Sequence, residues 1–125
     1  MKFALFTKLD SNENNDHIFS VFKSLDKHQL DYDVDSQSFD LISKLDNYNR
    51  DFNFSKVEKL SNEYDFVISI GGDGTILRSA NEIGELSIPI IGLNKGRLGF
   101  LANSPIEIID SIIDLISNCI FGFWF

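Results

Sequence analysis

Three glycines around a single carboxylate carry the clearest chemical potential in this chain: Gly71, Gly72, Asp73 and Gly74, followed by Thr75. Glycine has no Cβ, so the backbone can turn sharply here and a ligand can approach its N–H groups closely. A helix that starts after the turn adds free amides and a dipole that favour an anion. Because a carboxylate repels phosphate, Asp73 is better suited to act as a base or as an acceptor for a sugar hydroxyl. The combination indicates phosphoryl transfer to a hydroxyl.

A structural explanation of the same turn is a tight strand-to-helix connection in which Asp73 caps the helix. A second motif shifts the balance towards chemistry. Residues 94–101, Asn-Lys-Gly-Arg-Leu-Gly-Phe-Leu, follow the next expected strand. They form either a structural loop that contains two glycines and ends in apolar residues, or a second loop that faces a ligand. Open α/β folds place their sites at the carboxyl ends of the strands, and both motifs would lie there.

The elements that must position these motifs follow from the hydrophobic pattern. Apolar, β-branched runs predict strands at 3–6, 66–70 and about 87–93, with Pro89 near the start of the last, and a short strand at 32–35. Helical spacing predicts helices at 16–28 (N-cap Asp16), near 39–45, at 75–83, and at 106–120 after Ser104 and Pro105. Residues 10–16 and 47–53 are expected to be loops, and residues 57–64 to lead into the strand at 66. The alternation predicts an α/β domain with a mostly parallel sheet.

Length and composition limit the possible classes of protein. The 125 residues suffice for one domain. Eleven Lys and Arg against 19 Asp and Glu give a net charge of −8, so no general attraction to nucleic acid or anionic lipid is expected. The single cysteine, Cys119, excludes an intrachain disulfide, and with only two histidines a structural zinc site is not expected. We expect a cytoplasmic protein, because no apolar stretch reaches membrane-spanning length and no signal peptide is recognisable.

Taken together, the two motifs resemble those of the NAD kinase family, whose members phosphorylate the adenosine ribose 2′-hydroxyl of NAD. Residues 71–75 match its Gly-Gly-Asp-Gly-Thr motif, and residues 94–101 match its Asn-x-Gly-x-Leu-Gly-Phe-Leu motif. The glycine motif alone is also similar to that of diacylglycerol and sphingosine kinases and of phosphofructokinases, and the second motif favours NAD kinases among them. The resemblance covers residues 2 to about 114. It implies a three-layer, Rossmann-like first domain with a parallel sheet.

The resemblance also implies roles for the glycine motif. Asp73 would be the catalytic base that accepts the 2′-hydroxyl proton, and Asp73 and Gly74 would contact NAD. The backbone amides of Gly71, Gly72, Gly74 and Thr75 would lie near the phosphates of ATP or another donor. The charge of those phosphates would be partly neutralised by Mg²⁺ or another divalent cation. No residue of the chain is expected to bind the metal directly.

Four residues outside the motif core have weaker assignments. Arg78 matches the position of a basic NAD contact in part of the family, and its alternative is a solvated surface arginine. Phe100 would form an apolar wall near the nucleotide, although core packing is at least as good an explanation. Lys95 and Arg97 flank the second turn and could meet phosphates, but a solvated role is favoured.

The end of the chain departs from the family pattern. NAD kinases have a second, all-β domain with an Asn-Glu pair, and the only Asn-Glu dipeptides here lie before or too close to the glycine motif. We therefore expect an α/β domain at 1–120, an aberrant aromatic tail at 121–125 and no C-terminal β domain. Such a fragment would be weakly active or inactive, whereas a full-length protein would form homo-oligomers. The alternatives are a non-catalytic nucleotide-binding fragment, a lipid kinase domain and, with least support, a sugar-phosphate kinase.

Overall fold

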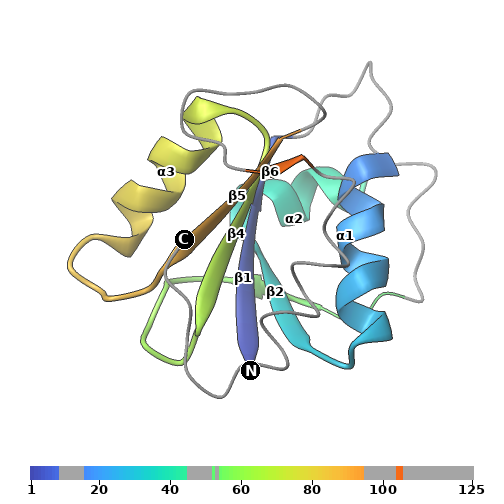
Figure 1. Ribbon diagram of the computed structural model, residues 1–125, viewed down its shortest axis with the longest axis horizontal. Coiled ribbons are helices and arrows are strands. Elements are labelled where there is room, and N and C mark those ends of the chain that lie inside the picture. Colours follow the sequence, from blue (N-terminus) through green and yellow to red (C-terminus); the bar gives the residue numbers. More distant parts are fainter. Residues whose placement is uncertain (9–15, 45–51, 53, 95–103, 106–125) are drawn as a thin grey trace.

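A parallel sheet with helices on both faces organises the chain, as seen in a computed structural model that describes residues 1–8, 16–44, 52, 54–94 and 104–105 (Figure 1). The described strands form a six-stranded sheet in the order β3-β2-β1-β4-β5-β6, and every pairing is parallel. The strands are β1 Lys2–Thr7, β2 Asp31–Asp35, β3 Ser55–Val57, β4 Phe66–Ile70, β5 Ile90–Asn94 and β6 Ser104–Pro105.

Three described helices complete the layers. They are α1 Asp16–Lys27, α2 Ser36–Ile42 and α3 Asp73–Ile83. Figure 1 shows α1 and α3 on opposite sides of the sheet. The arrangement is the three-layer, Rossmann-like α/β fold predicted from the sequence.

The two faces of the sheet build two separate cores. Along β1, Phe3 and Leu5 enter the cluster under α1, whereas Ala4 and Phe6 enter the cluster under α3. Side chains alternate between the faces of a strand, so a strand that is covered on both sides must be apolar at nearly every position. This explains the unbroken apolar runs of β1 and β4. The α1 cluster is rich in aromatic side chains, including Phe19, Phe22, Tyr32, Phe52 and Phe66.

Most elements expected from the sequence are present. The predicted strands correspond to β1, β2, β4 and β5, and Pro89 directly precedes β5. The predicted helices at 16–28 and near 39–45 correspond to α1 and α2, although α2 begins earlier, at Ser36. Asp16 is the first residue of α1. Because the N-cap is the residue before the first helical one, Asp16 is not the N-cap that we expected.

Four details differ from the expectations. The edge strand β3 was not predicted, because three residues are too short to show an alternating pattern. Helix α3 begins at Asp73 rather than Thr75, and its N-cap is Gly72 rather than Asp73, because Gly72 is the last residue with extended backbone. Ser104 and Pro105 pair with Leu93 and Asn94 as β6, although we expected them to open a helix. Residues 10–15 of the loop predicted at 10–16 lie outside the described residues. So do most of the loop at 47–53, the helix at 106–120 and the tail at 121–125.

A buried tyrosine next to β2 provides a test of this packing. The Tyr64 hydroxyl donates a 2.8 Å hydrogen bond to Asp33 Oδ2. Burial, and then this hydrogen bond, raise the pKa of Tyr64 above its usual value. The folded protein therefore keeps the Tyr64 hydroxyl proton at a pH where the unfolded chain, above about pH 10, releases it. The contribution of the protonated Tyr64 to the free energy of unfolding is lost as the pH rises further. We expect Tyr64→Phe to lower the free energy of unfolding by about 1–2 kcal/mol at pH 7.

Urea denaturation of both proteins between about pH 8 and pH 11 checks this prediction. The wild-type free energy of unfolding should fall more steeply above about pH 10 than that of Tyr64→Phe. Parallel curves for the two proteins would contradict the prediction.

Candidate active site

The candidate site lies where the winding of the sheet reverses. Strands β1 and β4 are neighbours, with Thr7 paired to Ile70 at their carboxyl ends. From β1 the chain continues to α1 on one face, and from β4 it continues to α3 on the other. Connections that leave neighbouring strands in opposite directions open a crevice between them, where doubly wound sheets bind ligands. The ends of β1 and β4 must therefore border any ligand bound in this crevice.

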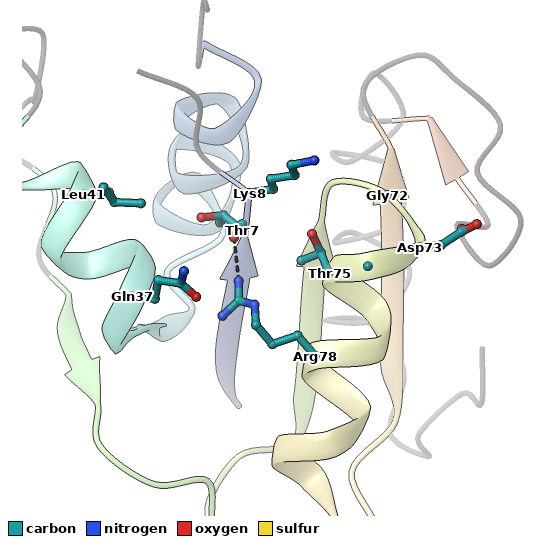
Figure 2. A pocket seen from close by; sticks show the side chains of 9 residues that line it. Thr7, Lys8, Gln37, Leu41, Gly72, Asp73, Thr75 and Arg78 are labelled. Atoms are coloured by element: carbon teal, nitrogen blue, oxygen red, sulfur yellow. Dashed lines mark hydrogen bonds between the residues drawn. The ribbon is translucent and has the colours of Figure 1, made fainter. Parts of the chain in front are cut away.

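A cavity of about 390 Å³ occupies this place. Figure 2 shows side chains from the end of β1, from α2 and from α3 around it. The residues that line it are Thr7, Lys8, Gln37, Leu41, Gly72, Asp73, Gly74, Thr75 and Arg78.

The structure brings most of the predicted site residues together. Five of them, Gly72, Asp73, Gly74, Thr75 and Arg78, line the cavity, and Gly71 precedes them in the turn. Asp73 is partly exposed and lies in the first turn of α3. In Figure 2 its side chain points away from those of Thr75 and Arg78. Phe100, Lys95 and Arg97 lie outside the described residues, so their assignments stay predictions.

The glycines of the turn have different structural roles. Gly71 has a φ of +154°, and a Cβ on it would lie 2.6 Å from Thr75 Oγ1 and 3.3 Å from Lys8 Cβ. Its backbone N–H donates to the Leu93 carbonyl oxygen at 3.0 Å, which ties the turn to β5. By contrast, a Cβ on Gly72 or Gly74 would meet nothing within 4 Å. Of these three glycines, only Gly71 is therefore required by the described part of the fold, and the other two leave open space beside the backbone.

The start of α3 adds polar groups to this space. The N-cap is Gly72, which has no side chain to accept hydrogen bonds from the first-turn amides. The Gly72 carbonyl oxygen accepts from the backbone N–H groups of Thr75 and Ile76 at 3.1 and 3.3 Å. An acceptor supplied by a ligand would complement an uncapped helix start of this kind.

Arg78 is an anchored side chain, so the solvated alternative was wrong. Its Nη1 donates to Asp35 Oδ2 at 2.7 Å, and its Nη2 donates to the Thr7 carbonyl oxygen at 2.6 Å. The guanidinium carbon lies 5.3 Å from the centre of the Phe6 ring, within range of a cation–π contact. Arg78 also lines a second cavity of about 200 Å³ on the side of β2 and the segment after β3.

Sequence reasoning missed the residues that β1 and α2 contribute: Thr7, Lys8, Gln37 and Leu41. Thr7 and Lys8 could have been found, because they directly follow the strand predicted at 3–6, at the same sheet edge as the glycine turn. Gln37 and Leu41 carry no such signal. In the part of the chain that the structure describes, no group of three acidic, histidine or cysteine side chains could hold a metal ion. No described helix is long and apolar enough to cross a membrane.

Comparisons with known proteins agree with this geometry. A family profile described as ATP-NAD kinase N-terminal domain matches residues 10–119. The chain is 39% identical over 122 residues to an NAD kinase of Bacteroides fragilis, which covers 94% of this chain and 41% of the relative. It is 36% identical over 115 residues to an NAD kinase of Christiangramia forsetii, and the match covers 91% of this chain and 39% of the relative. The chain thus spans about two fifths of the length of these curated relatives.

Solved structures support the fold. A yeast NADH kinase complexed with NADH superposes with a TM-score of 0.67 at 14% identity and covers 90% of this chain and 36% of the other. An NAD kinase from Archaeoglobus fulgidus in complex with ATP gives a TM-score of 0.59 at 23% identity. The match covers 94% of this chain and 37% of the other. At these identities the likeness concerns the arrangement of strands and helices.

Proposed function

The chain belongs to the NAD kinase family, and from this premise we propose that it contributes the first domain of an enzyme that phosphorylates the adenosine ribose 2′-hydroxyl of NAD. The observation that carries the proposal is the position of the glycine turn. Gly72, Asp73 and Gly74 line a cavity of about 390 Å³ at the point where the winding of the sheet reverses. We propose that residues 1–120 form this α/β domain.

In the proposed reaction Asp73 is the proton acceptor. The ribose oxygen forms a bond to the terminal phosphorus of ATP while the bond from that phosphorus to ADP breaks, and the hydroxyl proton passes to the Asp73 carboxylate. A positioned carboxylate contributes roughly 10²–10⁴-fold to such a rate. The partly exposed position of Asp73 in the first turn of α3 supports this role, because a substrate hydroxyl can reach it.

The backbone around Asp73 would hold the phosphates. We assign this role to the amides of Gly72 and Gly74. The expectation does not hold for Gly71 and Thr75, because their N–H groups already donate to the carbonyl oxygens of Leu93 and Gly72. We assign NAD contacts to Asp73, Gly74, Arg78 and Phe100. A divalent cation such as Mg²⁺ would neutralise part of the phosphate charge. We propose that this cation arrives with ATP, since Mg²⁺ is commonly bound through substrate phosphates.

A second candidate is a domain that binds a nucleotide without turning it over. The observation behind it is that the chain matches only 39% to 41% of the length of its relatives. A lipid kinase is disfavoured by the second motif. Cytoplasmic location and homo-oligomerisation of a full-length protein are further proposals that rest on the family.

Calorimetry and a product assay on the purified chain separate the two candidates. Titrations with ATP–Mg²⁺ and with NAD⁺ measure binding, and a dehydrogenase specific for NADP⁺ detects product. Binding with NADP⁺ formation supports the kinase, and binding without product supports the non-catalytic domain. If neither nucleotide binds, both candidates are wrong for this chain.

A substitution at Gly72 tests whether the nucleotide lies at the turn. Its backbone is extended, with φ −116° and ψ −161°, and a Cβ meets nothing within 4 Å. We therefore expect Gly72→Val to fold normally but to fill the open space and weaken nucleotide binding at least tenfold, since about 1.4 kcal/mol of lost contact or new repulsion suffices. The control is Ser87→Val, at an exposed position outside the cavity. Unchanged binding by Gly72→Val would exclude the turn as the nucleotide site.

A further inference from the structure

We propose that Asp35 is a positioning residue, which holds the guanidinium of Arg78 in a fixed orientation for a nucleotide in the adjoining cavity. The proposal rests on the proposed function for the identity of the ligand. The orientation of Arg78 can be tested without any ligand.

The first observation is the set of hydrogen bonds that Arg78 makes. Its two terminal nitrogens reach two different strands, because Nη1 donates to Asp35 at the end of β2 and Nη2 donates to the carbonyl oxygen of Thr7 at the end of β1. Both bonds are short, at 2.7 and 2.6 Å. Hydrogen bonds with charged partners are shorter and stronger than neutral ones, and they fix the plane of a guanidinium group.

The carboxylate that receives Arg78 is itself held in place. Asp35 is 5% exposed, and its Oδ2 also accepts from the backbone N–H of Ser38 at 3.3 Å, which makes it the N-cap of α2. The Ser38 hydroxyl accepts a 2.6 Å hydrogen bond from Thr7 Oγ1 and donates to the Thr7 carbonyl oxygen at 3.2 Å. Thr7, Ser38, Asp35 and Arg78 thus form one connected network, whose members restrict each other's geometry.

Capping alone does not explain a charged residue at this buried position. Serine, threonine or asparagine caps a helix as well as aspartate does. A buried carboxylate, in contrast, loses hydration free energy, and Asp35 Oδ1 has no hydrogen-bond partner among the described residues. The ion pair with Arg78 therefore explains why a negative charge is kept at this position.

The position of Arg78 would allow its fixed guanidinium to contact a ligand in the cavity. Its side chain is 31% exposed and lines both the 390 Å³ and the 200 Å³ cavities. A guanidinium has five N–H groups, and hydrogen bonds to described residues involve one N–H on each of the two η nitrogens. The remaining donors can be offered to a ribose or phosphate oxygen without first ordering a long side chain, which lowers the entropic cost of binding.

The central variant is Asp35→Asn, which keeps a side-chain oxygen for the α2 cap and removes the charge. In wild-type protein we expect separate NMR signals for the Nη groups of Arg78, because its hydrogen bonds slow rotation of the guanidinium. In Asp35→Asn these signals should merge, and affinity for NAD⁺ should fall about tenfold, which is the scale of a weakened charged hydrogen bond. The control is Asp40→Asn on the exposed side of α2, which should change neither signal nor affinity.

A double-mutant cycle with Arg78→Lys separates positioning from a general effect on folding. A single ammonium group cannot reproduce the two-nitrogen contact with Asp35 and Thr7, so Arg78→Lys alone should also weaken binding. In that background Asp35→Asn should change affinity less than about twofold, because its effect acts through Arg78. A full tenfold loss in the Arg78→Lys background would overturn the proposal.

Two further results would also overturn it. One is an Arg78 guanidinium that rotates freely in wild-type protein. The other is unchanged NAD⁺ affinity in Asp35→Asn although the Arg78 signals have merged. If the wild-type chain binds no NAD⁺ while its Arg78 signals stay separate, the anchoring by Asp35 is upheld and the proposed function fails.

Discussion

Replacing Gly71 with alanine is expected to lower the free energy of unfolding by about 2–5 kcal/mol, because two unfavourable effects combine. At its φ of +154° an L-residue is strained, and the new methyl carbon would lie 2.6 Å from Thr75 Oγ1. Thr75 is 4% exposed and belongs to the first turn of α3, so its side chain has little free space into which it could rotate. Urea denaturation followed by circular dichroism measures the loss.

Gly74→Ala and Gly72→Ala are matched controls within the same turn. A Cβ at either position meets no atom within 4 Å. Gly74 lies inside α3, where alanine is a better helix former, so Gly74→Ala should leave the free energy of unfolding unchanged or raise it by up to about 1 kcal/mol. If Gly71→Ala is no less stable than Gly74→Ala, our account of the turn is wrong.

The contrast among the glycines bears on function. Among the three glycines of the turn, the described fold requires glycine at Gly71 alone, whereas Gly72 and Gly74 border open space. A side chain at either position would occupy space beside the backbone of the turn, where we propose that the nucleotide lies. Stability measurements on the three alanine variants, combined with the binding measurements on Gly72→Val, would thus assign each glycine to folding or to ligand approach.

The sheet could largely be predicted from the sequence because its central strands are buried on both faces. Strands β1 and β4 read as continuous apolar runs for that reason. The edge strands could not be predicted, since β3 has three residues and β6 has two, too few to show any period. Ser104 and Pro105 also combine a good helix cap with a good first-turn residue, so local preference favoured the wrong element there.

The candidate site could be predicted only where residues are close in sequence. The residues of the glycine motif are adjacent in sequence and could be recognised as a group, and most of them line the cavity together. The partner of Arg78 could not be inferred, because Asp35 lies 43 positions earlier and meets it only after β2 and α3 have packed on β1. Arg78 was therefore open to interpretation as a solvated side chain.

The second large effect is expected for Asp73→Asn, which keeps the size of the side chain and removes its basicity. If Asp73 accepts the ribose proton, the rate of NADP⁺ formation should fall roughly 10²–10⁴-fold. Affinity for NAD⁺ should change little, because asparagine can still accept a hydrogen bond from the ribose. Rates at saturating NAD⁺ and calorimetric titration measure the two quantities. The control is Glu85→Gln, at an exposed position after α3 that lines neither of the two cavities described above.

The same variant tests the charge at the turn without requiring turnover. Asp73 places a negative charge in the first turn of α3, beside the amides that we assign to the donor phosphates. Removing that charge reduces repulsion of phosphate, so Asp73→Asn should bind ATP–Mg²⁺ at least as tightly as the wild-type chain. Weaker ATP binding would mean that the phosphates lie elsewhere. A rate equal to wild type would mean that the ribose proton goes to another group, and the glycine turn would then serve only to bind.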